Sequence, residues 1–231
     1  MVNRIWHKLS TAGLFTNQDP SVKRYIILTN RFAIIIGLMA CMIVLIVFHD
    51  PTRPGLSSTR IFILLSALII MSIVWINHLR YYKLAKLLIS WVPATLILVI
   101  SMQEKIFLTE YVNIPDFFTY RFLIMATSII PVLVYNTSEM RLMIFNLIPS
   151  FTGTVLFNPL NQLIGVDFER YGFHIPSLYI MDSIILFAYV GLVGFLMNQR
   201  VIFDRFEVSL CNKQSVLEEK NKELRDERAG R

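Results

Sequence analysis

Apolar runs that are nearly free of Lys, Arg, Asp and Glu recur along the chain, separated by short polar connections. The runs cover residues 32–48, 61–77, 87–102, 122–138, 142–166 and 171–199, with Asp182 as their single charged residue. Even the shortest run, with 16 residues, approaches the length with which an α-helix crosses the roughly 30 Å hydrocarbon core of a bilayer. The pattern therefore predicts an all-α, polytopic membrane protein with six transmembrane helices.

Proline and glycine set the ends of the last two helices. The fifth and sixth runs are longer than one span and contain four helix breakers, Pro159, Gly165, Gly172 and Pro176. We therefore expect the fifth helix at about residues 140–157 and the sixth at about residues 177–203. Residues 158–176 are expected to form an external loop. Tight turns at residues 78–82 and 137–139 pair helix two with helix three and helix four with helix five.

Composition and charge agree with this class of protein. Of 231 residues, 55% are hydrophobic and 16% are charged, and the mean hydropathy is +0.58, which excludes a disordered chain and disfavours a water-soluble domain. On the six-helix topology, 17 of the 22 Lys and Arg residues lie on the side that holds both termini. The positive-inside rule places that side in the cytoplasm. The net charge of +6 then needs no nucleic acid partner, and a basic inner face favours anionic membrane lipids.

Signatures of catalysis and of cofactors are absent from the sequence. The four histidines, His7, His49, His78 and His174, fall in four separate segments, so no metal site is visible. Every lysine is expected in a tail or at a membrane edge, which argues against a retinal Schiff base. No GxSxG, Walker or GxGxxG motif occurs, and two cysteines, Cys41 and Cys211, are too few for a disulfide framework. We expect neither an enzyme activity nor a cofactor in this chain.

One acidic residue is a candidate for recognition. Asp182 is the only carboxylate or ammonium group that the pattern places inside a span, where a charge costs at least about 2.5–3.5 kcal/mol. Asp182 is expected near the outer end of helix six, and Arg121 near the outer end of helix four. The hypothesis is that Asp182 and Arg121 form the polar part of an outward-opening ligand pocket. The alternative is an acid close enough to the head groups to stay hydrated.

Three prolines predict kinks in successive helices. Pro93, Pro131 and Pro149 lie within helices three, four and five, and each removes a backbone donor. A kinked bundle opens a cavity more readily than a straight one, and nearby candidates to line it are Trp91, Ser128, Asn146, Phe151, Thr152 and Tyr189. The alternative is ordinary helix packing, in which Ser, Thr and Asn side chains bond to a neighbouring helix.

The C-terminal tail predicts one helix that leaves the membrane without interruption. No Pro or Gly occurs between Gly194 and Gly230, and apolar residues recur every seven positions as Phe203, Leu210, Leu217 and Leu224. The intervening core positions are polar, namely Glu207, Gln214 and Asn221. Such a seam is typical of a weak parallel coiled-coil dimer, in which Asn221 would fix the register. The alternative is a solvated, charged single helix.

The chain thus divides into three predicted parts. Residues 1–30 form an N-terminal cytoplasmic segment, residues 31–203 a six-helix membrane domain, and residues 204–231 a cytoplasmic helix. In the first part, apolar residues around Trp6 alternate with Arg4, His7 and Lys8, which suits a helix lying at the head-group level. A flexible basic tail is the alternative.

Several segments resemble a known family. The entry segment from Asn17 to Arg31, the closely spaced spans, the loop Asn158-Pro159-Leu160-Asn161-Gln162-Leu163-Ile164-Gly165-Val166 and the coil Leu217-Glu218-Glu219-Lys220-Asn221-Lys222-Glu223-Leu224 look like a bacterial six-helix receptor module. That module precedes histidine kinase or class III adenylate/guanylate cyclase domains, and its layout is similar to that of quorum-sensing receptor kinases. The resemblance is architectural and covers nearly the whole chain.

The resemblance implies a sensor in the bacterial inner membrane, with both termini in the cytoplasm, that passes a signal through a parallel homodimeric coil to a catalytic output. A lipophilic small molecule or the membrane itself would be the stimulus. No kinase or cyclase residues precede Arg231, so we expect either a truncated receptor or a separate output partner. Two alternatives are a passive anchor for such an enzyme and a small transporter or channel.

Overall fold

The computed structural model describes residues 2–15, 18, 20–48, 57–107, 112, 114–172 and 178–229. Within these residues the chain forms helices and turns and no strand. The α-helices are α1 (Val2–Ser10), α2 (Pro20–Phe48), α3 (Ser57–His78), α4 (Tyr82–Phe107), α5 (Ile114–Thr127), α6 (Ile129–Val134), α7 (Met140–Val155), α8 (Phe157–Ile164) and α9 (Leu178–Ala229). Two short 3-10 helices, η3 (Thr137–Glu139) and η4 (Glu169–Tyr171), lie in the connections.

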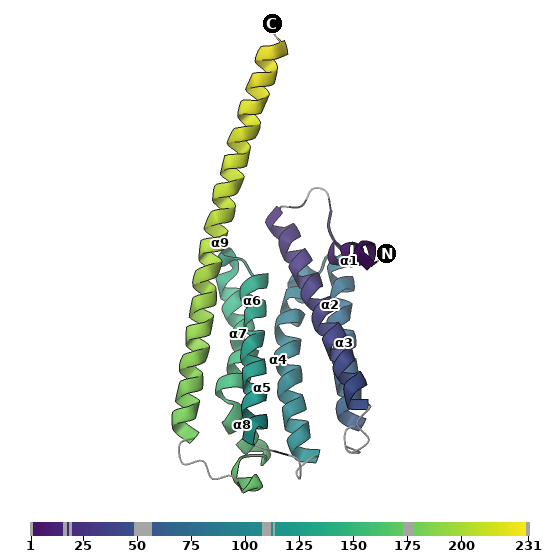
Figure 1. Ribbon diagram of the computed structural model, residues 1–231, viewed down its shortest axis with the longest axis vertical. Coiled ribbons are helices and arrows are strands. Elements are labelled where there is room, and N and C mark those ends of the chain that lie inside the picture. The colour runs from purple at the N-terminus through teal and green to yellow at the C-terminus, as the bar shows by residue number, and fades with distance from the viewer. Residues whose placement is uncertain are drawn as a thin grey trace.

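The long helices form an up-and-down bundle (Figure 1). Helices α2, α3, α4, α5 with α6, α7 and α9 run alternately in opposite directions, and α9 projects far beyond the others. We call the end from which α9 projects, where α1 and η3 also lie, the tail end, and the opposite end, where α8 lies, the loop end. Both the N-terminal helix and the base of the projecting tail therefore lie at the tail end.

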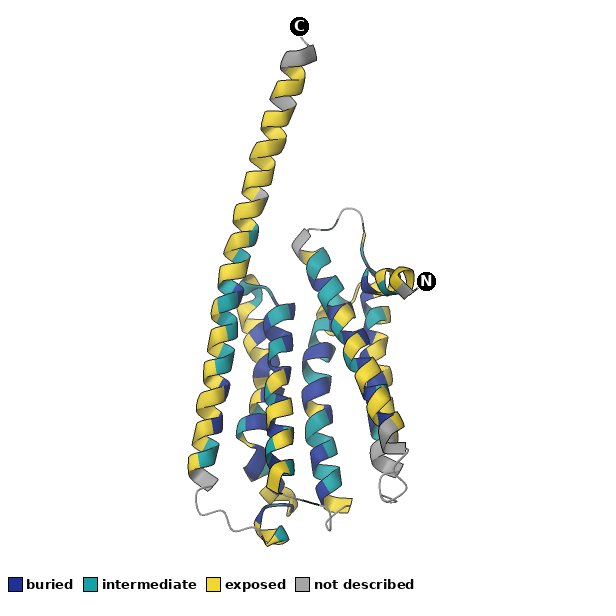
Figure 2. Cartoon of the chain, viewed as in Figure 1, coloured by how far each residue is buried: buried dark blue, intermediate teal, exposed yellow. Residues whose placement is uncertain are grey.

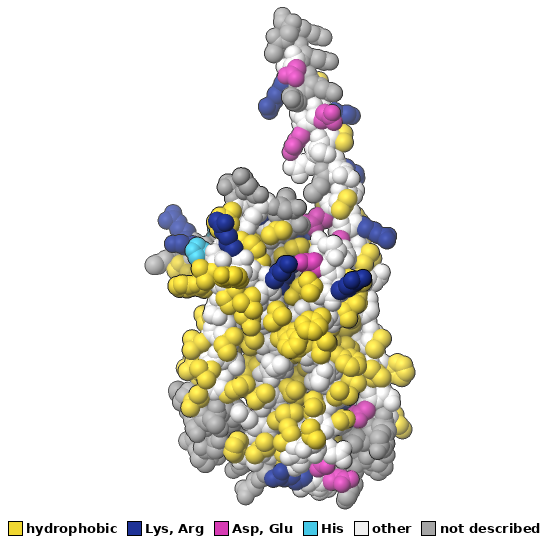
Figure 3. All heavy atoms as spheres, turned by 180° about the vertical axis from the view of Figure 1, so that it is seen from behind, with side chains coloured by type: hydrophobic (Ala, Val, Ile, Leu, Met, Phe, Trp, Pro, Cys, Tyr) yellow, Lys and Arg dark blue, Asp and Glu magenta, His cyan; other side chains and the backbone are white. Residues whose placement is uncertain are grey.

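The bundle has the composition of a membrane domain. Among the described residues, five helices are long and apolar enough to cross a membrane, and α7 with α8 passes the same test as a pair bent by 66° at its break. Large apolar side chains are exposed around the bundle (Figures 2 and 3), as a lipid-facing surface requires. An all-α polytopic fold is thus confirmed, and a count of six spans depends on the bent pair.

Proline breaks the bundle helices in two places. The run of α-helix is interrupted at Ser128 between α5 and α6, and at Leu156 between α7 and α8. Ser128 keeps right-handed helical dihedrals, whereas Leu156, with φ of −93° and ψ of 17°, departs from them. In each case a proline, Pro131 or Pro159, follows three residues later. Because proline cannot donate to the carbonyl four residues earlier and its ring clashes with it, the preceding turn opens. By contrast, α4 and α7 continue as helices through Pro93 and Pro149.

The segment predicted as an external loop is partly helical, which corrects that expectation. Residues 157–164 form α8, and Gly165, with φ of 71°, closes it through the bonds Gly165 N to Gln162 O and Val166 N to Asn161 O. The left-handed conformation suits glycine because L residues with a Cβ are strained at positive φ, although the space around Gly165 is open. The polar sequence around Pro159 reads as a loop, but Phe157 and Asn161 face the bundle and are buried.

The N-terminal helix is attached firmly to the bundle. Asn30 is fully buried, donates to the carbonyls of Leu9, Ser10 and Ala12 at the end of α1, and accepts from Asn77 at 2.7 Å. Gly13, with φ of 87°, packs so closely on the Asn77 backbone that a Cβ would overlap it. These contacts satisfy the free carbonyls at the end of α1 and fix α1 across the tail end.

Helix α9 is continuous over 52 residues, from the bundle into the tail. The predicted uninterrupted helix is therefore confirmed. The structure holds one chain, so the predicted dimer stays a prediction. Along the tail, Phe203, Leu210, Leu217 and Leu224 are all more than half exposed. Exposed apolar residues repeated at this spacing need a covering surface in water, and none is provided by the described part of the bundle.

Candidate functional site

Polar side chains gather where α9 passes each end of the bundle. At the loop end they come from α4, α5, α7, α8 and α9, and we call this group the loop-end cluster: Lys105, Arg121, Thr154, Asn158, Asn161 and Asp182. At the tail end they come from α2, α4, η3 and α9, and we call this group the clasp: Arg24, Tyr25, Lys86, Thr137, Glu139, Arg200, Asp204 and Glu207. Each group contains side chains that hold α9 to the rest of the bundle.

Arg121 and Asp182 form an ion pair in the loop-end cluster. Arg121 is 1% exposed, and its Nη1 lies 2.7 Å from Asp182 Oδ1, while its Nε donates to the carbonyl of Thr154. Asn158 donates to the same Asp182 oxygen at 2.7 Å. The structure therefore brings together the two residues proposed from the sequence as a polar element, and adds Asn158. Their role in ligand recognition stays a prediction.

Lys105 is a second buried cation at this end. Its side chain is 1% exposed and donates to Ser101 Oγ at 3.1 Å and Asn161 Oδ1 at 3.2 Å. The ammonium also lies 3.9 Å from the ring centre of Phe117 and 4.2 Å from that of Phe157. Aromatic faces and neutral oxygens thus replace water around the charge.

One expectation about charge in the spans needs correction. Asp182 is not the only ionisable group within the helices that qualify as spans by length and composition, because Lys105 and Arg121 also lie within such helices. The error comes from ending each span at the first charged residue. A cation that turns inward onto aromatic rings allows the helix to continue past that residue.

Several polar atoms of the loop-end cluster have no hydrogen-bond partner among the described residues. They are Arg121 Nη2, Asn158 Oδ1 and Thr154 Oγ1, and all three are buried. Buried polar atoms usually find partners, so each of these has unused bonding capacity. The cluster therefore combines a fixed ion pair with free donors and acceptors.

An aromatic layer underlies this cluster. Phe117 stacks on Phe168 with ring centres 4.0 Å apart, and Tyr171 meets Phe117 edge-on at 6.1 Å. The Tyr171 hydroxyl donates to the Lys105 carbonyl. Burial raises the pKa of Tyr171 above its ordinary value, against the opposing effect of Arg170, so the phenol keeps its proton and its donor role at neutral pH.

The other residues expected to line a cavity are occupied in helix packing. Trp91 packs on Phe145 at 5.4 Å, and Tyr189 packs on Phe151 at 5.6 Å and bonds to Ser150 at 2.8 Å. The Asn146 and Ser128 side chains donate to backbone carbonyls of their own helices, while Thr152 is half-buried. The Tyr189–Ser150 bond joins neighbouring helices, as the helix-packing alternative expects, whereas Asn146 and Ser128 bond within their own part of the chain. A role of these residues in lining a ligand cavity stays a prediction.

An apolar cavity lies elsewhere in the membrane domain. It measures about 300 Å³ and lies between α2, α3, α4 and α5 with α6. Pro93 lines it, together with apolar residues that include Met39, Ile97 and Leu123. Its one polar side chain, Thr127, donates its hydroxyl to the Ile124 carbonyl. The cavity therefore suits hydrocarbon and not a polar group.

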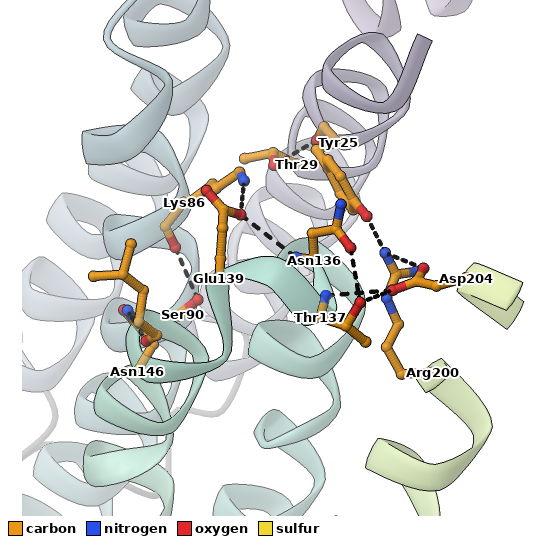
Figure 4. Close-up of polar contacts among 11 residues, drawn as sticks. Tyr25, Thr29, Lys86, Ser90, Asn136, Thr137, Glu139, Asn146, Arg200 and Asp204 are labelled. Carbon is orange, nitrogen blue, oxygen red and sulfur yellow. Dashed lines mark hydrogen bonds and ion pairs between the residues drawn. The ribbon is translucent and has the colours of Figure 1, made fainter. Parts of the chain in front are cut away.

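The clasp centres on Arg200 and Asp204 of α9 (Figure 4). Arg200 is 2% exposed, lies 3.1 Å from Asp204 and donates to the hydroxyl of Tyr25 on α2. The Asp204 carboxylate accepts from Thr137 Oγ1 at 2.8 Å and from Thr137 N at 3.3 Å. One turn of α9 is thereby bonded to both α2 and η3.

A second ion pair organises η3. Lys86 of α4 lies 2.6 Å from Glu139, which also accepts from the backbone N–H of Asn136 and closes a capping box. The Lys86 ammonium lies 4.7 Å from the Tyr25 ring centre and 5.1 Å from that of Tyr135. Burial and the nearby Glu139 carboxylate raise the pKa of Tyr135. A neutral phenol therefore faces Lys86.

The outermost contact of the clasp pairs Arg24 of α2 with Glu207 of α9. Both side chains are more than one-third exposed. Glu207 was expected as a core position of a coiled coil, but here it faces its own bundle. Phe206, by contrast, is 64% exposed and lies on the same side of α9 as Leu210 and Leu217.

Sequence reasoning missed the clasp and the role of Lys105. A usable signal was the spacing Arg200, Asp204, Glu207, because positions i, i+4 and i+7 share one face of a helix. That charged face lies opposite Arg24, in the segment that leads into the first span, and Thr137, in a short connection. Which residues meet across those connections required the tertiary structure.

The fold and the two clusters define a multi-pass helical membrane protein with a long projecting helix. No family model, no curated protein and no solved structure matches the chain at a significant level. The resemblance to six-helix receptor modules therefore stays a prediction, and the loop-end cluster, the clasp and α9 are the features that bear on the function of this chain.

Proposed function

We propose that this chain is a membrane sensor and dimerisation module of a bacterial plasma membrane. A change in the bundle is passed through α9 and a parallel coiled coil to a cytoplasmic output, either a histidine kinase or a nucleotide cyclase. The excess of Lys and Arg on the side of the termini supports a cytoplasmic tail end.

The observation that carries this proposal is the continuity of α9. One helix of 52 residues belongs to the bundle at its start and is solvent-exposed in its second half. Helices transmit tilt and rotation because their hydrogen bonds resist local bending. A movement at the loop end of α9 therefore reaches the tail without an intervening hinge.

The packing of α9 supports its movement relative to the other helices. Only a small part of its surface is buried within the described chain, and its backbone lies closest to α6, α7 and η3. The ion pair at Asp182 and the clasp at Arg200 and Asp204 are its main polar attachments. The outer contacts of the clasp, which are partly exposed, have alternative partners in water and head groups, which suits a two-state element.

A chimera tests the signalling role. The chain is fused through α9 to a reporter cyclase or kinase, and output is measured in cells and in vesicles against lipid extracts and lipophilic molecules. We expect output to vary with stimulus. In Val208→Pro, where proline breaks the exposed part of α9, output should lose this dependence, whereas the matched variant Val208→Ala should retain it. Constant output in the unmodified chimera would instead identify a passive anchor.

Spin labels test the dimer. Leu217 lies on the apolar side of the tail, and Val208, nine residues earlier, lies on the opposite side of the helix. With Cys41 and Cys211 replaced by Ser, a label at position 217 should report a short distance between chains, as expected for helices about 10 Å apart. A label at position 208 should report a longer distance. The dimer is contradicted by equal distances or by no dipolar signal at either position.

A further inference from the structure

A second cavity lies at the tail end, next to the clasp. It measures about 200 Å³ and is enclosed by α2, the end of α3, the start of α4 and η3. Lining residues include Val22, Ile26 and Tyr82, and the cavity reaches Lys86 and Glu139 of the clasp. Figure 4 shows Lys86 and Glu139 meeting beside Tyr25 and Thr29. The cavity is thus continuous with the contacts that hold η3.

Two lysines supply the available donors of this cavity. Lys83 is exposed at its edge, and Lys86 is largely buried with Glu139 as its ionic partner. An ammonium has three N–H donors, and Glu139 accounts for one bond of Lys86. The cavity therefore has two cations against one carboxylate and favours an anion.

The remaining polar groups of the cavity are already engaged within the protein. The Tyr82 hydroxyl donates to the Gly13 carbonyl, Thr29 donates to the Tyr25 carbonyl, and the Asn77 amide donates to Asn30. The rest of the surface consists of aliphatic side chains and tyrosine rings. A free phosphate would leave most of its oxygens facing apolar atoms, which is costly. A phospholipid instead places its phosphate at the lysines and its hydrocarbon against Val22 and Ile26.

The location favours a lipid head group as well. Helix α1 lies across the same end of the bundle (Figure 1) with Ile5 and Leu9 exposed, as in a helix resting at the head-group level. Tyr81, beside the cavity residue Tyr82, is 63% exposed, and aromatic side chains concentrate at this depth of a membrane. Basic pockets between helices on the cytoplasmic side are suited to anionic head groups.

We infer that the tail-end cavity binds the head group of an anionic phospholipid between Lys83 and Lys86. The bound phosphate competes with Glu139 for Lys86. Because Glu139 closes the capping box of η3 and Thr137 of η3 bonds to Asp204, this competition loosens η3 on α9. The regulatory part rests on the proposed function, whereas binding of the lipid does not.

Lipid retention tests the binding. The full chain is reconstituted in vesicles of phosphatidylcholine and phosphatidylglycerol, and the lipids retained per chain are counted by native mass spectrometry. We expect preferential retention of phosphatidylglycerol. Lys83→Gln should reduce it about fivefold, as one surface lysine contributes roughly 1 kcal/mol. The control Arg141→Gln removes an exposed charge outside the cavity and should leave retention unchanged.

Two results would overturn the binding proposal. Equal retention in Lys83→Gln and Arg141→Gln would show that the lysine pair does not hold the lipid. Displacement of phosphatidylglycerol by inorganic phosphate or glycerol 1-phosphate would show that a free phosphate is the ligand and would overturn the lipid assignment. Neither result depends on whether the chain transmits a signal.

A separate measurement tests the regulatory part. Spin labels at Ser138 and Val208, both exposed, report the distance from η3 to α9 in labelled chains diluted with unlabelled ones. Phosphatidylglycerol should shift the distances to longer values, and Lys83→Gln should weaken the shift as it weakens retention of the lipid. An undiminished shift in Lys83→Gln, or no shift with lipid bound, would refute the competition with Glu139.

Discussion

The loop-end cluster and the clasp hold the same helix by different means. At the loop end, Arg121 is fully enclosed when it meets Asp182, and Lys105 nearby is enclosed by aromatic rings. The centre of the clasp is enclosed as well, with Arg200 2% and Asp204 15% exposed, but Glu139, Arg24 and Glu207 around it are 30–37% exposed. Water therefore competes for the outer contacts of the clasp and not for Arg121 or Arg200.

The two groups therefore contribute differently to the stability of the fold and to the freedom of α9 to move. Removing one partner of a buried pair leaves a charge without solvent and costs about 3–5 kcal/mol, whereas an exposed pair contributes about 0–1 kcal/mol. The loop end therefore fixes where α9 begins, and the outer contacts of the clasp adjust the position of α9 at modest cost. A sensor needs both properties, because a signal is read as movement of one end relative to a fixed other end.

The largest expected effect comes from Asp182→Asn. Arg121 keeps its charge inside the bundle but loses its carboxylate partner, so stability should fall by about 3 kcal/mol, near the lower limit for buried pairs because Asp182 itself is 28% exposed. Thermal unfolding in detergent measures this loss. Response to stimulus in the chimera should also be abolished while the protein still assembles.

Asp167→Asn is the matched control for that substitution. Asp167 lies at the same end, and its carboxylate accepts a bond from the backbone of Arg170 in a surface turn. Its replacement should change stability by less than about 0.5 kcal/mol. If the two variants unfold at the same temperature, Asp182 does not fix α9 and the contrast between the two ends is lost.

An intermediate effect is expected for Thr137→Val. The substitution removes the hydroxyl that donates to Asp204 but keeps the backbone bond, so stability should fall by about 1 kcal/mol. Hydrogen exchange should increase in η3 and in the neighbouring turn of α9. Thr119→Val, which removes an exposed hydroxyl bonded within α5, should produce neither change; similar exchange in both variants would exclude Thr137 as an attachment of α9.

The smallest effect on stability is expected for Arg24→Gln. Its pair with Glu207 is exposed and screened by salt, so the loss should stay below about 1 kcal/mol and diminish at high ionic strength. The basal output of the chimera should nevertheless change, because α9 loses its outermost attachment. Arg31→Gln, an exposed arginine on the same helix, is the control, and equal output in both variants would contradict a role of Arg24 in positioning α9.

Local sequence signals predicted much of the fold. Hydrophobic runs predicted the long helices, and the lack of helix breakers after Gly194 predicted the continuous α9. The predicted turn at residues 78–82 agrees with the end of α3 and the start of α4, and the predicted turn at residues 137–139 agrees with η3. Each of these features depends on residues close together in the chain. The pairing of Arg121 with Asp182 was anticipated because a buried acid requires a nearby cation.

Features that depend on packing could not be predicted in this way. Lys105 looks like the end of a span until Phe117 and Phe157 are seen around it. Helix α8 looks like a loop because its inward residues include Asn158 and Asn161, which bond to Asp182 and Lys105 from other helices. Polar residues whose partners are distant in sequence have no local signature.

The length of α9 converts small angular changes into large displacements. From Asp182 to Leu224 the helix rises about 60 Å, at 1.5 Å per residue. If Asp182 acts as the pivot of a lever, a tilt of roughly 5° moves the tip by about 5 Å, close to one helical turn. Thermal fluctuations at the pivot would be amplified by the same geometry, so attachments partway along the lever, at Asp204 and Glu207, limit noise as well as movement.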